Sequence, residues 1–375
     1  MSDGVEVRVT GMAWSTALGS GLDEVWRALL AGDSGIADVP SEHPLRNGRA
    51  AALPGLPLDK DPVERQVSLA RGTLAAALRD AGLSAAGSRP RPVLGTSYGP
   101  HLDTGDVSLL DGWSRDAVRG LGPLKTPVPV TTACSSGSDS LMVGAELIRS
   151  GEEDICVCGA ADILTPAKRL GHSALGTMSP TTLRAFDAGR DGTLLGEGAA
   201  FLVLESGDSA VARGAPSYGR LAGAASSNDA AGLAAPDMSG DGVVRAVAGA
   251  LRAAGRDAGD VAVINAHGSG TPANDLVECR AYGRVFAGPA RPVVFATKGA
   301  FGHTLGATGA IEAVALLLAL RDGVVPPVHG LAAAMPGFPL PLPAGAAARF
   351  DGDLGLSVTL GFGGFNTCLA FEGAP

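Results

Sequence analysis

Cys134 lies in a segment whose residue order suits a nucleophile. The segment Thr131–Gly137 (TTACSSG) joins a β-rich run, Val128–Thr132, to an apolar helix predicted over Ser138–Ser150. Unpaired N–H groups and the helix dipole at the start of a helix favour a negative charge, so we expect a thiolate with a depressed pKa. Such a thiolate would take up an acyl group as a thioester. The other cysteines are interpreted as small buried hydrophobes: Cys156, Cys158, Cys279 and Cys368.

Two histidines follow predicted strands and are surrounded by glycines. They are His267 in Asn265–Pro272 (NAHGSGTP) and His303 in Lys298–Gly306 (KGAFGHTLG). Glycine allows another group to approach the backbone closely, which suits a site better than a core. For either histidine alone, a packing role is an equal alternative. The remaining four are interpreted as surface or packing residues: His43, His101, His172 and His329.

The elements that must position these side chains alternate between strands and helices. The periodicity predicts helices over Leu22–Ala31 and Val63–Ala81, and strands over Val5–Thr10, Pro92–Thr96, Asp154–Cys158 and Ala199–Leu204. The second half repeats the plan, with a helix over Val243–Gly255, a strand over Val261–Asn265 and a helix over Leu305–Arg321. This alternation is typical of α/β proteins. We predict a duplicated chain with halves at 1–212 and 213–375, joined near Gly207–Ser217 and packed as one unit.

Composition excludes several functional classes. The chain has 375 residues, a formal charge of −9 and only four lysines, so a broad nucleic-acid or anionic-lipid surface is not expected. The longest apolar stretches, such as Ala313–Leu320, are too short to span a membrane. Five cysteines without a CxxC pair, and no recognisable signal peptide, favour a reducing cytoplasm. No metal or redox-cofactor motif is recognised.

Several motifs stand in the order found in β-ketoacyl-acyl-carrier-protein synthases, and from Val9 to Asn366 the chain resembles that family. They are Cys134 in TACSSG, Phe186–Gly192 (FDAGRDG) with Gly196–Gly198, His267 with Asn274–Asp275, Lys298 with His303, and Gly361–Asn366 (GFGGFN). The resemblance implies an α/β thiolase fold, in which two duplicated halves form a five-layered α-β-α-β-α architecture. It also implies a Cys134–His267–His303 triad that performs decarboxylative condensation on carrier-bound acyl groups.

The resemblance gives roles to further residues. Lys298 and Glu312 would support charge and orientation around His303, with a plain surface ion pair as the alternative. Ser269 and Thr271 would hydrogen-bond the phosphopantetheine arm that arrives on the substrate, so no resident cofactor is implied. Phe362 would be a gatekeeping aromatic beside Cys134, and N–H groups of both residues would form an oxyanion hole.

The chain also departs from the family pattern. The 100–128 segment is shorter than usual, no family-like helix is recognised over Asp111–Lys125, and Thr193 stands where a bulky aromatic is usual, which predicts a different acyl pocket. Other stretches resemble type II polyketide synthase subunits, so we expect an acyl carrier protein as partner and a homodimer or a heterodimer with a chain-length-factor-like subunit. Arg65 and Arg71 are candidates for docking the acidic carrier.

Three other activities remain open at this stage. A ketosynthase-like acyltransferase would use Cys134 to make an ester or amide without decarboxylation, with one histidine as general base. A non-catalytic partner subunit would only shape a tunnel, although such subunits lack the cysteine that is present here. A thiolase acting on coenzyme A esters would use a second cysteine in place of one histidine, and both histidines are present.

Overall fold

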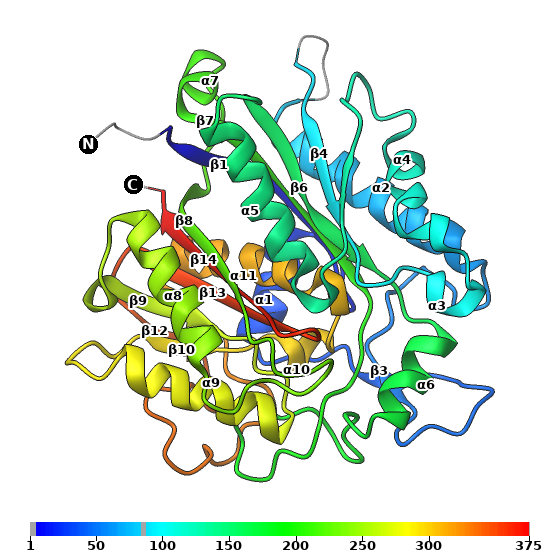
Figure 1. Cartoon of the computed structure of the whole chain (residues 1–375), viewed down its shortest axis with the longest axis vertical. Coiled ribbons are helices and arrows are strands. Elements are labelled where there is room, and N and C mark those ends of the chain that lie inside the picture. Colours follow the sequence, from blue (N-terminus) through cyan, green and yellow to red (C-terminus); the bar gives the residue numbers. More distant parts are fainter. Residues whose placement is uncertain (1–4, 84–87, 375) are drawn as a thin grey trace.

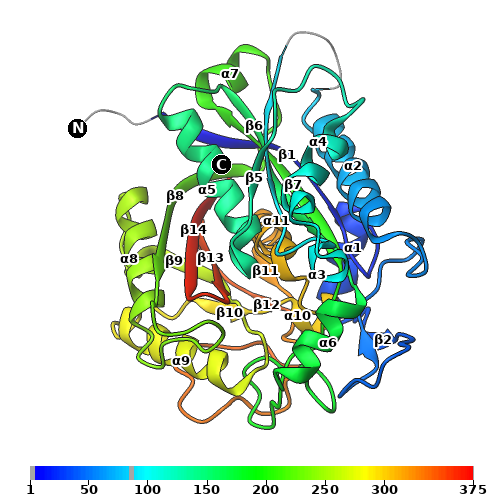
Figure 2. The same cartoon turned by 45° about the vertical axis from the view of Figure 1, so that its right-hand side comes forward.

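A computed structural model describes residues 5–83 and 88–374 (Figure 1). Within these residues ten strands form one mixed sheet in the order β10-β9-β13-β14-β8-β1-β7-β6-β4-β5. Only two residue pairs join β1 to β8, and the strands on either side of this link diverge into two sets of five (Figure 2). No helix of the described part combines the length and hydropathy needed to cross a membrane.

The first set of strands and its helices come from the N-terminal half. The elements are β1 (Val7–Ser15), α1 (Leu22–Leu30), β2 (Ala37–Asp38), β3 (Arg49–Ala50), α2 (Pro62–Asp80), β4 (Arg91–Gly95), α3 (His101–Thr104), η1 (Val107–Leu110), α4 (Gly112–Val118), β5 (Val128–Val130), η2 (Ala133–Ser135), α5 (Ser136–Arg149), β6 (Ile155–Asp162), α6 (Pro166–Ala174), β7 (Gly198–Ser206) and α7 (Gly207–Ala212).

The second set comes from the C-terminal half. Its elements are β8 (Gly219–Asn228), α8 (Asp241–Ala254), η3 (Ala258–Asp260), β9 (Val261–Asn265), α9 (Pro272–Val285), β10 (Val293–Phe295), α10 (Lys298–Phe301), η4 (Leu305–Ala307), α11 (Thr308–Asp322), β11 (Val324–Val325), β12 (Ala348–Arg349), β13 (Leu354–Gly361) and β14 (Phe365–Gly373).

The two sets have the same topology. In the first, β1 pairs antiparallel with β7, β7 antiparallel with β6, β6 parallel with β4, and β4 parallel with β5. In the second, β8, β14, β13, β9 and β10 repeat these four pairings in the same order. The repeated strand order agrees with an internal duplication, while the boundary between residues 212 and 213 stays a prediction.

Helices cover both faces of each set. α5 packs on β4 and β6, α11 packs on β13 and β7, and the two helices contact each other, so they form a central layer. On the outer faces, α2 covers β1 and β7, and α8 covers β8 and β14. Every residue of α11 from Thr308 to Ala319 is buried, as a helix enclosed on all sides requires. The result is the predicted five-layered α-β-α-β-α order.

Each strand and helix predicted from the sequence is present in the described part of the chain, but several observed elements were not predicted, among them α6 and α9. β9 has the predicted bounds, and α2 differs from its prediction by one residue at each end. The strands β13 and β14 were not predicted, although they lie near the middle of the ten-stranded sheet. The segment between β4 and β5, in which no family-like helix was recognised, contains the short helix α4, whose Trp113 is buried against α2.

Candidate active site

Cys134 lies at the turn between β5 and α5, where the backbone is strained. Ala133 has a φ of 52°, a left-handed conformation that is uncommon for a residue with a Cβ. The turn is held by the buried carboxylate of Asp139, which accepts hydrogen bonds from Thr132 Oγ1 (2.5 Å), Ser135 Oγ (2.8 Å) and Thr367 Oγ1 (2.5 Å). This network fixes Cys134 with 5% of its surface exposed.

His303 lies at the equivalent turn of the second half, between β10 and α11. Leu305 has a φ of 50° there and leads through η4 into α11, as Ala133 leads through η2 into α5. The backbone N–H of Leu305 donates to His303 Nδ1 (3.1 Å). Because Nδ1 accepts this hydrogen bond, the neutral ring carries its proton on Nε2.

His267 lies at the carboxyl end of β9 and faces His303. The two ring centroids are 5.2 Å apart and the ring planes are 78° from parallel. The carboxylate of Glu278 accepts the backbone N–H groups of His267 (2.9 Å) and Gly268 (2.7 Å), which fixes the turn. The Nδ1 atom of His267 is buried without a hydrogen-bond partner in the described part of the chain.

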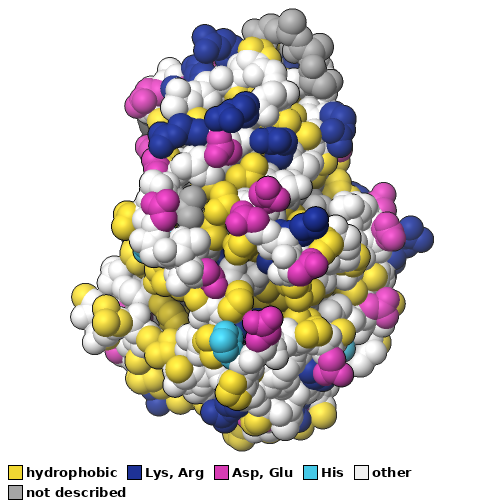
Figure 3. Space-filling model, turned by 90° about the vertical axis from the view of Figure 1, so that its right-hand side faces the viewer, with side chains coloured by type: hydrophobic (Ala, Val, Ile, Leu, Met, Phe, Trp, Pro, Cys, Tyr) yellow, Lys and Arg dark blue, Asp and Glu magenta, His cyan; other side chains and the backbone are white. Residues whose placement is uncertain are grey.

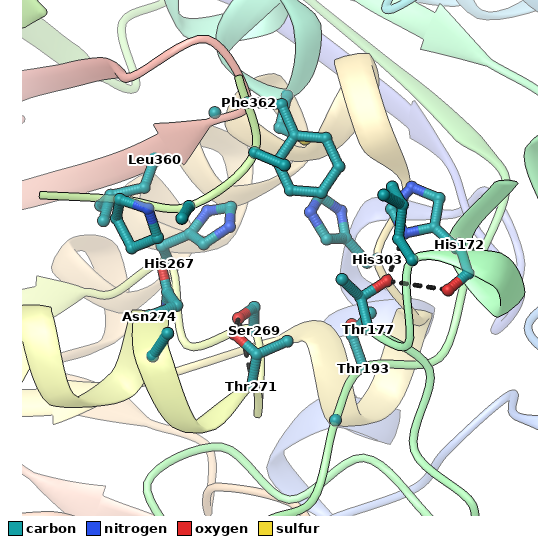
Figure 4. Close-up of a pocket in the computed structure, with 18 of the residues that line it drawn as sticks. His172, Thr177, Thr193, His267, Ser269, Thr271, Asn274, His303, Leu360 and Phe362 are labelled. Atoms are coloured by element: carbon teal, nitrogen blue, oxygen red, sulfur yellow. Dashed lines mark hydrogen bonds between the residues drawn. The ribbon is translucent and has the colours of Figure 1, made fainter. Parts of the chain in front are cut away.

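A cavity of about 420 Å³ joins these side chains. Seven of the nine residues predicted for the site line it: Cys134, Thr193, His267, Ser269, Thr271, His303 and Phe362. Figure 4 shows His267 and His303 on one side of Phe362, with Ser269 and Thr271 below them. Ser269 Oγ and Thr271 Oγ1 lie 2.9 Å apart at the start of α9. The structure therefore brings residues from five separate segments to one cavity.

The other two predicted residues, Lys298 and Glu312, form a buried ion pair next to the cavity. Lys298 Nζ lies 2.5 Å from Glu312 Oε1 and 2.5 Å from the backbone oxygen of His267. Each side chain is 1% exposed, so the alternative of a plain surface ion pair is wrong. Lys298 contacts His267 directly, and its charge also lowers the pKa of His303. Burial raises the pKa of Glu312 to about 8, against the attraction of Lys298.

The expected depressed pKa of Cys134 is not observed. Burial raises the pKa of this thiol to about 11, and it outweighs the hydrogen bond from the Phe362 N–H and the charge of Lys298, which both lower it. Burial also holds the pKa of His267 and of His303 well below the ordinary value, and Lys298 adds to the effect. The resting site is thus a neutral thiol facing two neutral imidazoles.

Sequence reasoning missed a third histidine in the cavity. His172, interpreted as a surface or packing residue, lines the cavity from α6, and its ring stacks on Phe362 with centroids 5.6 Å apart. Its Nδ1 lies 3.0 Å from Thr177 Oγ1. Burial lowers the pKa of His172 to about 4, so the ring is neutral near pH 7. The residue has no glycine neighbourhood like that of His267, and only the fold brings it to the site.

The docking role expected for Arg65 is also wrong. Arg65 is 3% exposed and pairs with the buried carboxylate of Glu197 at 2.5 Å. Its amphipathic helix α2 turns this side chain inward, whereas Arg71 on the same helix stays exposed. A carrier protein that docks on this surface could contact Arg71 but not Arg65.

The duplicated, five-layered architecture is the thiolase fold, and the chain belongs to the β-ketoacyl synthase family. It matches the family models of the beta-ketoacyl synthase N-terminal domain (residues 5–55 and 126–210) and C-terminal domain (residues 218–332). It is 31% identical to 3-oxoacyl-acyl-carrier-protein synthase 2 of Vibrio harveyi over 98% of each chain. The corresponding enzyme of Synechocystis sp. is 38% identical, over 64% of this chain and 60% of its own length.

Solved ketosynthase structures have the same fold. The ishigamide ketosynthase/chain length factor is 31% identical, with a TM-score of 0.88 over 99% of this chain and 100% of the other. A type II polyketide synthase ketosynthase, solved with its acyl-carrier protein and bound to the hexaketide, is 25% identical, with a TM-score of 0.90 over 100% of both chains. The recognition of the family and of its fold from the sequence is therefore confirmed.

Proposed function

We propose that the protein is a discrete β-ketoacyl synthase that condenses a malonyl-type thioester with an acyl group on Cys134, in polyketide or related secondary metabolism. The observation that carries the proposal is the meeting of Cys134, His267 and His303 in one cavity. Ketosynthase relatives of fatty-acid and polyketide synthesis support the reaction class. The similarity to type II polyketide synthase structures supports the context.

The first step is transfer of the acyl group to Cys134. The Sγ–carbonyl bond forms and the bond to the pantetheine sulfur breaks, while the thiol proton passes to a neutral imidazole of the site and then to the leaving sulfur. The Phe362 N–H, which already donates toward Cys134 Sγ, and the Cys134 N–H would stabilise the oxyanion. A raised thiol pKa makes this proton acceptor necessary, because little thiolate exists beforehand.

The second step is decarboxylation of the malonyl group and condensation. The bond to the carboxylate carbon breaks, CO₂ leaves, and the electron pair forms an enolate whose charge lies on the thioester oxygen. The Nε2–H of His303 can donate to that oxygen, because Leu305 holds Nδ1 as an acceptor. We assign the same task to His267. The enolate carbon then attacks the Cys134 thioester, the bond to Sγ breaks, and the cysteine leaves as a thiolate that takes up a proton from water to restore the thiol.

The residues around these three have supporting roles in the proposal. Lys298 and Glu312 hold the His267 backbone, while Ser269 and Thr271 line the path of the phosphopantetheine arm. Phe362 gates the cysteine, and Thr193 shapes the acyl side of the cavity. The pantetheine arrives on the substrate, so the proposal needs no resident cofactor. All five cysteines are free and buried, which agrees with the reducing cytoplasm we propose as its location.

An acyl carrier protein and a second ketosynthase-type subunit are the proposed partners. The related ketosynthase solved with its acyl-carrier protein supports the first. For the second, β5 is an edge strand, and the segment before it exposes Leu102 (48%) and Val107 (67%). Figure 3 shows hydrophobic side chains across the middle of this side of the molecule. The native mass of the chain purified alone distinguishes a homodimer from a protein that requires a chain-length-factor-like partner.

The test follows acylation and CO₂ release together. The protein is incubated with acyl-carrier and malonyl-carrier substrates, and intact mass and released CO₂ are measured beside Cys134→Ala and His303→Ala. We expect acylation that requires Cys134 and CO₂ release that requires His303. Transfer of the acyl group to an amine or alcohol without CO₂ would replace the proposal by an acyltransferase. No acylation, alone or with an added partner subunit, would leave only a structural role.

A further inference from the structure

A buried carboxylate from the first half of the chain holds the turn that carries His303 (Figure 4). Asp162 lies at the end of β6, and its Oδ2 accepts the backbone N–H of Gly306 (2.9 Å), three residues after the histidine. The same oxygen accepts the backbone N–H of Ser97 (2.8 Å), in the loop that follows β4. Oδ1 accepts a hydrogen bond from Lys168 Nζ on α6. One side chain therefore ties three segments of the first half to the His303 turn.

Asp162 and Lys168 form an ion pair that water does not reach. The exposed fraction of the Lys168 side chain is 1%, and that of Asp162 is 0%. Lys168 Nζ also donates to the backbone oxygen of Ile163 (3.0 Å). Apolar residues of similar volume often stabilise a fold as well as a buried ion pair does, so stability alone does not account for this one. Its contact with a catalytic turn indicates a role in the site.

The His303 turn depends on its surroundings for its shape. Leu305 has a φ of 50°, and such a conformation persists in a residue with a Cβ only where neighbouring groups fix it. The Leu305 nitrogen and Thr308 Oγ1 lie 3.1 and 3.2 Å from His303 Nδ1. Gly306 lies between these two residues, so Asp162 holds the middle of the segment that keeps the proton of the neutral ring on Nε2.

A similar contact holds the turn at Cys134. Asp139 belongs to α5 of the first half and accepts a hydrogen bond from Thr367 on β14 of the second half (2.5 Å). Asp162 also connects the two halves, because Gly306 belongs to the second. Each of these catalytic turns is thus fixed by a carboxylate that accepts a hydrogen bond across the contact between the halves.

We propose that Asp162, together with Lys168, positions His303 for decarboxylation by fixing the turn that keeps its Nε2–H directed to the thioester oxygen. Asp162 does not line the cavity, so it acts through His303 and not on the substrate. Burial is the main cause of the raised pKa of Cys134, and the charge of Asp162 adds to it. Loss of this charge therefore does not disfavour acylation. The inference rests on the proposed function, since it concerns the step assigned to His303.

The test uses two double variants that differ only in a hydrogen-bond acceptor. Asp162→Asn with Lys168→Met keeps one amide oxygen for the two N–H groups and removes the cation that an amide would leave unpaired. Asp162→Leu with Lys168→Met has nearly the same volume and no acceptor. Glu205→Gln is the matched control, because Glu205 is 0% exposed and pairs with Arg213. It lies opposite Ile155, at the far end of β6 from the Asp162 site.

The assays separate acylation from decarboxylation. Each protein is incubated with the hexanoyl and then with the malonyl thioester of N-acetylcysteamine. Acylation of Cys134 is followed by intact mass, and released CO₂ is measured on the acylated protein. The tautomer of the His303 ring is determined from the nitrogen chemical shifts of isotope-labelled histidine, with His303→Ala to assign the signal. Thermal unfolding of each variant verifies that it is folded.

We expect the double variant with Asp162→Asn, and Glu205→Gln, to keep the wild-type ratio of CO₂ release to acylation and the Nε2–H tautomer. In the double variant with Asp162→Leu the ratio should fall about tenfold or more, because a displacement of about 1 Å costs about 10²-fold in rate. An equal ratio in the two double variants would overturn the inference and leave the proposed function standing. An Nδ1–H tautomer of His303 in the wild type would overturn it as well, whichever variants fold. A wild-type protein that is acylated without releasing CO₂ would refute the proposed function, and this inference with it.

Discussion

The contact between the two central helices gives a prediction that the structure makes quantitative. A Cβ added at Gly137, in the first turn of α5, would lie 2.8 Å from the backbone nitrogen of Ala310 and 3.0 Å from the oxygen of Gly306. Both atoms belong to the backbone of the α11 region and cannot rotate away. Gly137→Ala must therefore separate the two helices by about half an ångström, because interiors are close-packed.

The energetic effect combines two opposite contributions. Overpacking of a well-filled core costs about 1–3 kcal/mol, and replacing glycine by alanine in a helix returns up to about 1 kcal/mol. The expected net loss in the free energy of unfolding is about 0.5–2 kcal/mol. The same displacement separates Cys134 from His303, because each lies at the start of one helix. A displacement of 1 Å costs about 10²-fold in rate, so we expect about tenfold here.

The control is Gly72→Ala in the exposed middle of α2, where no atom lies within 4 Å of the added Cβ. This change should raise the free energy of unfolding by about 0.5–1 kcal/mol and leave activity unchanged. Urea unfolding and the rate of Cys134 acylation are measured for both variants. If Gly137→Ala matches Gly72→Ala in stability and in acylation rate, the backbone contact between α5 and α11 is refuted.

Three further predictions concern buried charges. Alkylation of Cys134 by iodoacetamide should accelerate about tenfold per pH unit from pH 7 to 10, because only the thiolate reacts and a pKa of about 11 keeps the thiol protonated. A plateau of the rate below pH 9 would show the depressed pKa expected from the sequence. Arg65→Met should cost about 3–5 kcal/mol in urea unfolding, because it leaves the Glu197 carboxylate buried and unpaired; a loss below about 1 kcal/mol would contradict the pairing. Lys298→Met removes a charge that lowers the pKa of Glu312, so this pKa should rise further above its wild-type value of about 8. The folded state then keeps its proton to higher pH, and the variant should go on losing stability between pH 8 and 10, where the wild-type loss levels off; equal slopes of stability against pH in that range would refute this.

The sequence was most informative where chemistry depends on local order. Cys134, His267 and His303 lie in turns that come after strands, so each could be recognised as a candidate from the local sequence. Their meeting was implied only by the family resemblance, because β5 and β10 are the two edge strands of the sheet and only the packing of the two halves brings these turns together. β14 (FNTCLAFEG) was not predicted because it is buried along nearly its whole length and shows no alternation of polar and apolar residues. β13 (LGLSVTLG) does alternate apolar residues with glycine, serine and threonine, so its sequence carried a strand signal that was overlooked.

Electrostatic properties were harder to predict from the sequence. The helix start after Cys134 predicts a stabilised thiolate, but burial raises the pKa of the thiol instead. This desolvation depends on the segments from later in the chain that cover the thiol, which the local sequence does not show. His172 and Arg65 show the same dependence. One side chain faces a cavity and the other a buried carboxylate because of tertiary packing that no local pattern encodes.

The order of strands in the sheet has a consequence for how the protein acquires reactivity during synthesis. The hairpin of β13 and β14 emerges from the ribosome after all the other strands, yet it inserts between β9 and β8 in the interior of the sheet. Until it does, the second set of strands is divided and the Phe362 turn, which follows β13, is absent from Cys134. The nucleophile is thus made early and its surroundings are completed late. A nascent chain cannot begin acyl transfer before its C-terminal hairpin has joined the sheet.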